Sequence, residues 1–352
     1  MNKLKVADLF AGVGGLSQGF ISKGFVIEFA IEYNKEIANS YKLNHPNTTV
    51  YDEDISKVDL VKLNSKHPNI DVIVGGPPCQ GFSQKGKRLS INDERNYYFK
   101  KFIDAVRIFK PLYFVLENVP NILTTANGFF KEEIISGFEK LGYTVNSKTL
   151  NASDFGVPQN RKRAFFIGSL NGNLIDFPNP KKKITTIKEA IYDLPFIESG
   201  EGKDFFEYEK QPNSEFQKKL RENSKGIFNH ISTKHSKVAL ERLQLIPKGK
   251  GKEVLPPEHR TKSIYSGTWS RLLEDGIAAT ITTRFDTPSS GLFTHPTLNR
   301  CLTVREAARI QTFSDNFVFY GTKTVQMKQV GNAVPPMLAA EIATVILKDY
   351  NK

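Results

Sequence analysis

Cysteine is nearly absent from this chain of 352 residues, which contains only Cys79 and Cys301. Two thiols cannot build a disulfide framework or a cysteine cluster for structural zinc. The sequence also lacks any apolar run of the roughly 18 residues that a membrane helix needs, and its first residues lack the pattern of an export signal. We therefore expect a cytoplasmic protein without a bound metal and without a membrane partner.

Acidic side chains are also fewer than basic ones. Lys and Arg number 49 against 37 Asp and Glu, which gives a formal net charge of +12. Such an excess of positive charge favours a polyanionic partner, although basic proteins of other kinds exist. The length is sufficient for one large core and a second, smaller unit, so two domains are expected.

Short apolar runs alternate with helical patterns in the first half of the chain, which is the βαβ rhythm of a mostly parallel sheet. We expect strands over 5–10, 25–31, 49–51, 71–74, 113–117, 143–150 and 164–167, and helices over 16–23, 37–43, 97–109 and 129–141. From about Asp176 the chain becomes polar, lysine-rich and weakly periodic, which indicates a separate, less regular domain. Helical patterns return over 303–311 and 335–347, and the apolar last helix is expected to rejoin the first domain.

Cys79 follows the apolar run 71–74 within the sequence Gly-Gly-Pro-Pro-Cys-Gln-Gly-Phe-Ser. A stiff loop at the carboxyl end of a buried strand is where open α/β sheets place their active sites. A nucleophilic thiolate needs access to substrate and an electropositive setting, and such a loop can supply both. We therefore interpret Cys79 as a nucleophile rather than a structural cysteine, and Cys301 as a core residue.

A glycine loop, Asp8-Leu9-Phe10-Ala11-Gly12-Val13-Gly14-Gly15, joins the first expected strand to the first helix. Such a loop lets a ligand approach the backbone in front of a helix N-terminus. Glu32 lies 20 residues beyond Gly12 at the end of the second expected strand, the usual place for a carboxylate that binds ribose hydroxyls. Together these features favour an adenosine-containing cofactor, although a plain tight turn or a dinucleotide site has a similar pattern.

Charged side chains follow two further strands. Glu117 ends the run 113–117, whose strand is expected beside the one that carries Cys79, so its carboxyl is a candidate proton donor or hydrogen-bond anchor. Arg161 and Arg163 precede the strand 164–167, and alternation directs both toward one side. A fixed cation there would favour a thiolate or bind a carbonyl oxygen. The alternatives are a surface glutamate and a solvated basic turn.

Five motifs occur in order: the glycine loop, Pro77-Pro78-Cys79-Gln80, Glu117-Asn118-Val119, the Gln-x-Arg-x-Arg run 159–163, and Gln-Val-Gly-Asn-Ala-Val-Pro-Pro over 329–336. In this order they resemble the DNA (cytosine-5)-methyltransferase family of the prokaryotic restriction-modification type. The resemblance implies an α/β fold, a mostly parallel Rossmann-like methyltransferase sheet with an inserted smaller target-recognition domain. It places the catalytic domain at 1–177 and 323–352, and the target-recognition domain at 178–322.

The resemblance also implies a mechanism. Cytosine C5 is a poor nucleophile until a thiolate adds to C6. By similarity Cys79 forms this adduct, a protonated Glu117 stabilises N3, and Arg163 stabilises O2, with Arg161 as a supporting cation. S-adenosylmethionine would donate the methyl group, and the target cytosine must leave the duplex stack. The cofactor would be framed by Phe10, Ala11, Gly12, Gly14, Glu32, Tyr33, Asp54, Ile55, Pro78, Asn332 and Ala333.

Double-stranded DNA is the partner that the resemblance implies, and the loop 80–96 has the composition of a mobile loop that closes over the flipped base. The expected DNA contacts are Gln80, Ser83, Lys87, Arg88, Arg95, Arg271 and Arg284. We further expect a monomer, and a cognate restriction endonuclease that forms no stable complex with it.

Three other functions fit part of the sequence. A transfer RNA cytosine-5 methyltransferase would keep the same catalytic motifs, but the large insertion with basic, glycine-spaced loops favours DNA. A catalytically silent DNA-binding regulator would have no physical reason to keep Cys79, Glu117 and Arg163 together. A nicotinamide oxidoreductase is disfavoured because the glycine spacing departs from G-x-G-x-x-G.

Overall fold

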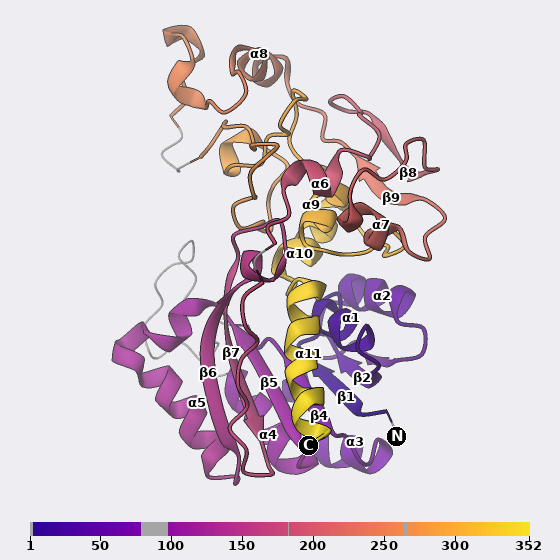
Figure 1. The fold of residues 1–352 in the computed structure, drawn as a ribbon, viewed down its shortest axis with the longest axis vertical. Coiled ribbons are helices and arrows are strands. Elements are labelled where there is room, and N and C mark those ends of the chain that lie inside the picture. Colours follow the sequence, from indigo (N-terminus) through magenta and orange to yellow (C-terminus); the bar gives the residue numbers. More distant parts are fainter. Residues whose placement is uncertain (1–2, 79–97, 182, 263–266) are drawn as a thin grey trace. The chain divides into compact units, whose positions relative to one another are not determined.

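The apolar runs of the first half form one seven-stranded sheet in the computed structural model, which describes residues 3–78, 98–181, 183–262 and 267–352 (Figure 1). The strands lie in the order β3-β2-β1-β4-β5-β7-β6. β1 to β5 are parallel, whereas β7 pairs antiparallel with both β5 and β6. The strands are β1 (Lys5–Leu9), β2 (Val26–Ile31), β3 (Thr49–Tyr51), β4 (Val72–Gly75), β5 (Tyr113–Asn118), β6 (Thr144–Asn151) and β7 (Lys162–Ser169).

Helices cover both faces of this sheet. The helices are α1 (Gly15–Ile21), α2 (Lys35–Asn44), α3 (Leu60–Lys66), α4 (Tyr98–Phe109), α5 (Phe129–Glu139) and α11 (Pro336–Tyr350). Successive side chains of β5 point to opposite faces of the sheet. Tyr113 donates its hydroxyl to Asp349 of α11 at 3.0 Å, whereas Phe114 stacks on Phe138 of α5 with ring centroids 3.8 Å apart. All seven predicted strands are present, so the predicted α/β fold is confirmed.

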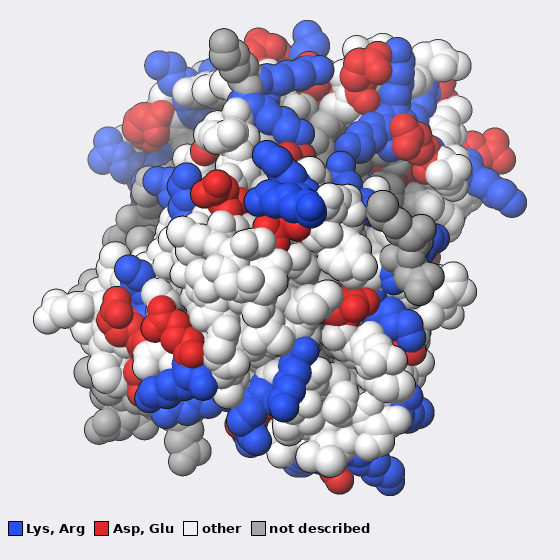
Figure 2. Space-filling model, turned by 60° about the horizontal axis from the view of Figure 1, so that its bottom comes forward, with Lys and Arg blue, Asp and Glu red and all other residues white. Residues whose placement is uncertain are grey.

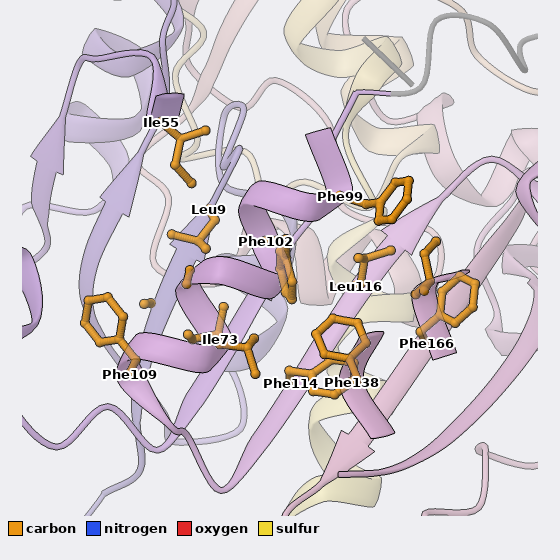
Figure 3. Packing of buried hydrophobic residues seen from close by; sticks show 14 of the residues in the cluster. Leu9, Ile55, Ile73, Phe99, Phe102, Phe109, Phe114, Leu116, Phe138 and Phe166 are labelled. Atoms are coloured by element: carbon orange, nitrogen blue, oxygen red, sulfur yellow. The ribbon is translucent and has the colours of Figure 1, made fainter. Parts of the chain in front are cut away.

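Aromatic side chains fill the core between the sheet and α4. Phe99, Phe102 and Phe109 are buried on one side of α4 at helical spacing. Figure 3 shows these rings over sheet residues such as Ile73 and Leu116. This packing holds the strands, and with them their carboxyl ends, in fixed positions.

The chain divides into two units. The first comprises Met1–Asn151, Lys162–Pro180 and Pro336–Lys352, and the second comprises Ala152–Arg161 and Lys181–Pro335. The second contains the two-stranded antiparallel sheet of β8 (Gly202–Phe206) and β9 (Ile227–Ile231), together with α6 (Ile187–Ile191), α7 (Glu215–Arg221), α8 (Lys237–Leu245), α9 (Val304–Ile310) and α10 (Lys323–Asn332). The last helix, α11, belongs to the first unit as predicted, whereas α10 belongs to the second. The functional division at 177/178 and 322/323 stays a prediction.

Buried ion pairs hold the second unit together. Arg300 donates two hydrogen bonds of 2.8 Å to the carboxylate of Glu306, and Arg309 binds Asp315 in the same bidentate way at 2.8 and 2.6 Å. Cys301 is buried beside them, as predicted. A core that contains so many charged side chains explains why the sequence of this unit has little apolar periodicity.

Lys323–Tyr350 is long and apolar enough for a membrane span by length and composition. It is nevertheless interrupted between α10 and α11, and 61% of its apolar window is buried inside the protein. Both helices therefore contribute to the protein core.

Candidate active site

The order of the parallel strands reverses between β1 and β4, because β2 and β3 lie on one side and β5 on the other. Ligands of open α/β sheets bind outside the carboxyl ends of the strands at such a switch point. The predicted cofactor loop follows β1, and the segment that leads to Cys79 follows β4. The two loops therefore flank the switch point of the first unit.

The glycine loop is fixed by backbone hydrogen bonds. The N–H of Ala11 donates to the carbonyl of Ile31 on β2 at 3.0 Å, and the N–H of Gly14 turns back to Ala11 at 3.0 Å. Gly12 donates its N–H to Glu32 at 2.9 Å. Apart from Gly12 itself and its two chain neighbours, no atom of the described part of the chain lies within 4 Å of the position that a Cβ would take at Gly12. The loop thus leaves room for a ligand against its backbone.

Glu32 connects this loop to the end of β2. One carboxylate oxygen accepts from Gly12 and the other from the N–H of Asn34 at 2.9 Å. The side chain is buried, and burial raises the pKa of Glu32 although these two hydrogen bonds oppose the shift. Each oxygen keeps a second lone pair for a hydroxyl donor. Tyr33 beside it is 72% exposed.

Asp54 and Ile55 lie beyond the end of β3. The Asp54 carboxylate accepts from the N–H of Ser56 at 2.9 Å, and this hydrogen bond lowers the pKa of Asp54. Ile55 is buried, and the N–H of Glu32 donates to the carbonyl of Tyr51 at 3.0 Å. The predicted cofactor residues that follow β1, β2 and β3 therefore lie along one continuous sheet edge.

Asp8 was given no role by the sequence, yet it lies beneath the glycine loop. It is fully buried, and burial raises its pKa to about 8. Ser17 of α1 donates to its Oδ2 at 2.6 Å, and Ser17 also lies 2.6 Å from the hydroxyl of Tyr41. Oδ1 of Asp8 has no hydrogen-bond partner among the described residues. The hydrogen bond between Ser17 and Asp8 links α1 to β1, the two elements that the glycine loop joins.

The segment after β4 is held from β5. Asn118 is buried and donates its side-chain N–H to the carbonyl of Pro77 at 3.0 Å. Its Oδ1 accepts from the N–H of Val119 at 2.8 Å, which fixes the amide orientation. Sequence reasoning missed this role, although Asn118 stands within the motif that contains Glu117. Pro78 is exposed, and Cys79 lies outside the described residues.

Glu117 and Arg163 meet on neighbouring strands of the same unit. Oε1 of Glu117 lies 2.8 Å from Nε of Arg163, and the side chains are 11% and 14% exposed. A Cβ at Gly76 would lie 2.7 Å from Oε2 of Glu117, so the carboxylate reaches the backbone of the segment that leads to Cys79 because residue 76 is glycine. A carboxylate, a guanidinium and this segment therefore lie within one small region.

Arg161 makes a different set of contacts. It precedes β7, belongs to the second unit and is fully buried, and its guanidinium donates to the carbonyls of Ile281 and Gly331 at 3.0 and 2.8 Å. In the same unit, Asn332 ends α10 with an exposed side chain, and Ala333 follows it. The predicted roles of all three residues stay predictions.

The two arginines predicted to read bases differ sharply. Arg271 is buried and uses its guanidinium N–H groups on protein acceptors, namely the carbonyls of Leu243, Ile246, His295 and Leu298 and the side chain of Asn299. All five guanidinium N–H groups therefore bind protein acceptors here, which favours a structural role for Arg271, and its predicted contact with a base stays a prediction. Arg284 has a 59% exposed side chain, with Asp286 3.0 Å away.

The other predicted DNA contacts, Gln80, Ser83, Lys87, Arg88 and Arg95, lie outside the described residues. On the face shown in Figure 2, basic side chains are interspersed with acidic ones around a wide uncharged area. The excess positive charge thus forms no single continuous patch on the face in view. Among the described residues, no group of three or more His, Cys, Asp or Glu side chains could hold a metal ion.

Comparison with known proteins decides the family. The sequence matches the family model "C-5 cytosine-specific DNA methylase" over residues 4–348, nearly its whole length. The chain is a C-5 cytosine-specific DNA methylase. The predicted family and the predicted enzyme class, DNA (cytosine-5)-methyltransferase, are therefore confirmed, and the nicotinamide oxidoreductase and the silent regulator are set aside.

Bacterial relatives of this methylase support the same assignment. It is 36% identical to the type II methyltransferase M.DdeI of Desulfomicrobium norvegicum, over 97% of this chain and 88% of the relative. It is 37% identical to M1.HphI of Haemophilus parahaemolyticus, over 98% and 87% of the two chains. Among solved structures, a protein from E. coli assigned as a prophage-encoded DNA modification methyltransferase superimposes with a TM-score of 0.83 at 30% identity, covering 99% of this methylase and 100% of that chain.

Proposed function

We propose that this methylase transfers a methyl group from S-adenosylmethionine to C5 of a flipped-out cytosine in a specific double-stranded DNA sequence. The observation that carries the proposal is the Glu117–Arg163 pair beside the segment that leads to Cys79. The type II methyltransferases that resemble the chain support sequence-specific DNA as the substrate. A cognate restriction endonuclease, a monomeric state and a cytoplasmic location stay predictions.

The residues at the sheet edge fit S-adenosylmethionine. Glu32 offers two buried oxygens with free lone pairs for ribose hydroxyls, Gly12 leaves open space at its backbone, and Asp54 and Ile55 follow the neighbouring strand. Phe10, Ala11, Gly14 and Tyr33 lie in the same loops, and Pro78 lies in the segment after β4. We assign Asn332 and Ala333 to the cofactor by family resemblance. When bound, S-adenosylmethionine supplies an electrophilic methyl group.

Cys79 would act as the nucleophile of the reaction. Its thiolate adds to C6 of the cytosine, which places electron density on C5 for attack on the methyl group. After transfer, a base removes the C5 proton, and the electrons of that C–H bond restore the C5–C6 double bond while Cys79 leaves as a thiolate. The enzyme ends each cycle unchanged, with methylated DNA and the demethylated cofactor as products.

Glu117 and Arg163 would stabilise the charge that develops on the base. Thiolate addition builds negative charge on N3 and O2, and fixed donors aimed at these atoms lower the barrier. In the described structure the two side chains bind each other at 2.8 Å. The cytosine would accept a hydrogen bond from Arg163 at O2 and contact Glu117 at N3. The guanidinium and the carboxyl that contact the base are therefore already paired with each other.

The covalent step can be tested with duplex DNA that carries 5-fluorocytosine at the target position. Fluorine at C5 cannot leave as a proton does, so an adduct with the wild-type enzyme should accumulate. We expect Cys79→Ser to abolish both the adduct and methyl transfer while DNA and cofactor binding persist. Near-normal turnover by this variant would remove Cys79 from the mechanism.

The substrate can be tested in the same expression strain. Bisulfite sequencing of cellular DNA should show methylation of one cytosine within one short sequence, and no methylation in cells that express Cys79→Ser. Transfer RNA from these cells is the second arm of the experiment. Methylation of the RNA without methylation of the DNA would overturn the proposed substrate.

A further inference from the structure

A buried polar cluster in the second unit connects two stretches of backbone that are distant in sequence. It consists of the side chains of Gln159, Arg161 and Gln311, and all three are fully buried. The guanidinium of Arg161 donates to the carbonyl of Ile281 at 3.0 Å and to that of Gly331 at 2.8 Å. One arginine thus fixes the segment 278–284 relative to the C-terminal end of α10. We call these three side chains the Arg161 cluster.

The two glutamines extend the connection. Gln159 accepts from the N–H of Ile281 at 2.7 Å and donates to Oε1 of Gln311 at 2.8 Å. Gln311 in turn donates to the carbonyl of Val330 at 2.6 Å. The cluster therefore binds backbone groups of both stretches and so fixes the path of the chain there.

The segment 278–284 is also held along its length. Ala278 donates its N–H to Pro158 at 2.9 Å, and Thr280 donates its hydroxyl to the carbonyl of Asn160 at 2.8 Å. On the other side, a Cβ at Gly331 would lie 2.2 Å from the carbonyl oxygen of Thr282. The two stretches are thus in direct backbone contact, which a side chain at residue 331 would prevent.

The outer end of this segment carries an exposed cation. Thr282 donates its hydroxyl to the carbonyl of Arg284 at 2.9 Å, and the side chain of Arg284 is 59% exposed. A side chain that recognises a base must be held within roughly 0.5 Å of its productive position. The buried end of the segment supplies this constraint through the Arg161 cluster.

We propose that Arg161 is a positioning residue for target recognition, which fixes the segment 278–284 so that Arg284 meets DNA in one register. This inference rests on the proposed function, in which the enzyme methylates one DNA sequence. A positioning residue differs from the supporting cation that the family resemblance implies. As a positioning residue, Arg161 affects which DNA sequence is methylated and not the rate of the chemical step.

The test compares Arg161→Met and Arg161→Lys with the wild-type enzyme. The target sequence is first established by bisulfite sequencing of the wild type, and kcat/KM is then measured on the cognate duplex and on duplexes with one changed base pair outside the target cytosine. One base contact supports roughly 5- to 150-fold discrimination. We expect Arg161→Met to lower the discrimination ratio by about tenfold, and Arg161→Lys to restore part of it.

Two further variants keep the test decisive. Thr280→Val removes only the hydrogen bond to Asn160, so it should fold and lower discrimination less, even where Arg161→Met fails to fold. Lys162→Met removes the exposed cation next to Arg161. It should leave the discrimination ratio unchanged, because loss of one exposed positive charge affects attraction to the phosphates of all sequences alike. The melting temperature of each variant separates loss of stability from loss of discrimination.

The rate of adduct formation distinguishes a positioning role of Arg161 from a role in the chemical step. Adduct formation with 5-fluorocytosine, at saturating cognate DNA, should stay near the wild-type rate in Arg161→Lys. A wild-type discrimination ratio in Arg161→Lys and Thr280→Val, with or without a slower adduct step, would overturn the positioning role. Failure of the wild-type enzyme to methylate DNA at any preferred sequence would instead refute the proposed function.

Discussion

Nε of Arg163 lies 2.8 Å from Oε1 of Glu117, across the antiparallel pairing of β7 with β5. Both side chains are largely shielded from water, and burial lowers the pKa of the Arg163 guanidinium while the charge of Glu117 opposes the shift. Each charge thus compensates the other in a site with little water. Removal of one partner from such a pair leaves a buried charge without compensation, which is costly.

Glu117→Gln should therefore affect both activity and stability. The amide keeps the shape of the side chain but cannot transfer a proton or carry a charge, so we expect methyl transfer to fall by roughly 10²- to 10⁴-fold. We also expect a lower melting temperature. The control is Glu132→Gln on α5, whose carboxylate is exposed and should be dispensable for both. Wild-type turnover by Glu117→Gln would exclude Glu117 from the reaction.

Asn118→Ala tests how the segment before Cys79 is held. The variant removes the hydrogen bond to the carbonyl of Pro77, which has a typical net value of about 1 kcal/mol. We expect slower adduct formation with 5-fluorocytosine DNA, and cofactor affinity is measured beside it because Pro78, the residue after Pro77, is a predicted cofactor contact. The adduct rate is measured by quenched-flow sampling, and a wild-type rate would show that Asn118 does not position the nucleophile.

Glu32→Ala tests the cofactor site. Loss of hydrogen bonds to a charged group should weaken binding of S-adenosylmethionine by roughly 1.5 to 3 kcal/mol. The variant also leaves the N–H groups of Gly12 and Asn34 without their present acceptor, so melting temperature must be recorded beside calorimetric affinity. Glu53→Ala, an exposed carboxylate of the same region, is the control. Unchanged affinity after loss of Glu32 would contradict its assignment to the ribose.

Arg271→Met and Arg284→Met separate structure from recognition. Loss of Arg271 leaves several buried carbonyls without donors, so we expect a lower melting temperature and an unchanged target sequence in the folded fraction. Loss of Arg284 should leave stability unchanged and alter site preference by roughly 1 to 3 kcal/mol. Methylation profiling and thermal denaturation of both variants check this, and the reverse pattern would contradict the structural assignment.

The lowered pKa of Glu306 predicts how the free energy of unfolding depends on pH. Burial by itself raises its pKa, but the charge and hydrogen bonds of Arg300 outweigh burial and hold the pKa well below its ordinary value. The ionised group therefore stabilises the fold above the ordinary glutamate pKa of about 4.3, and this stability is lost as the pH falls toward the folded-state pKa. Glu306→Gln should lower the free energy of unfolding at pH 7 by about 3 to 5 kcal/mol and flatten its fall below pH 4. Urea denaturation across this range is the measurement, with exposed Glu222→Gln as the control.

The sequence predicted the first unit well because its strands are short apolar runs with alternating faces. Buried runs such as 71–74 and 113–117 carry their own signal, and the motif loops follow directly from the ends of these strands. The second unit was predicted poorly, since its core uses Arg300, Arg305 and Arg309 where apolar residues are expected. Charged side chains carry no apolar periodicity, so α6, α7 and α8 and the β8–β9 pair were not predicted.

Local pattern also cannot distinguish an exposed arginine from a buried one. Arg271 and Arg284 both stand in polar, glycine-spaced or threonine-rich stretches, which gave both the same interpretation. What separates them is a set of carbonyls brought to Arg271 from α8 and from residues 295–299, and such long-range contacts leave no signal in neighbouring residues. Asp8 and Asn118 were missed for the same reason.

The pairing of α1 with α11 joins the beginning of the chain to its end. Gly19 of α1 packs so closely on α11 that a Cβ there would lie 2.4 Å from Cβ of Ala339. During synthesis α1 emerges before α11, with the whole second unit between them. The surface of α1 around Gly19 therefore stays without its partner helix until the ribosome has translated the second unit and released α11.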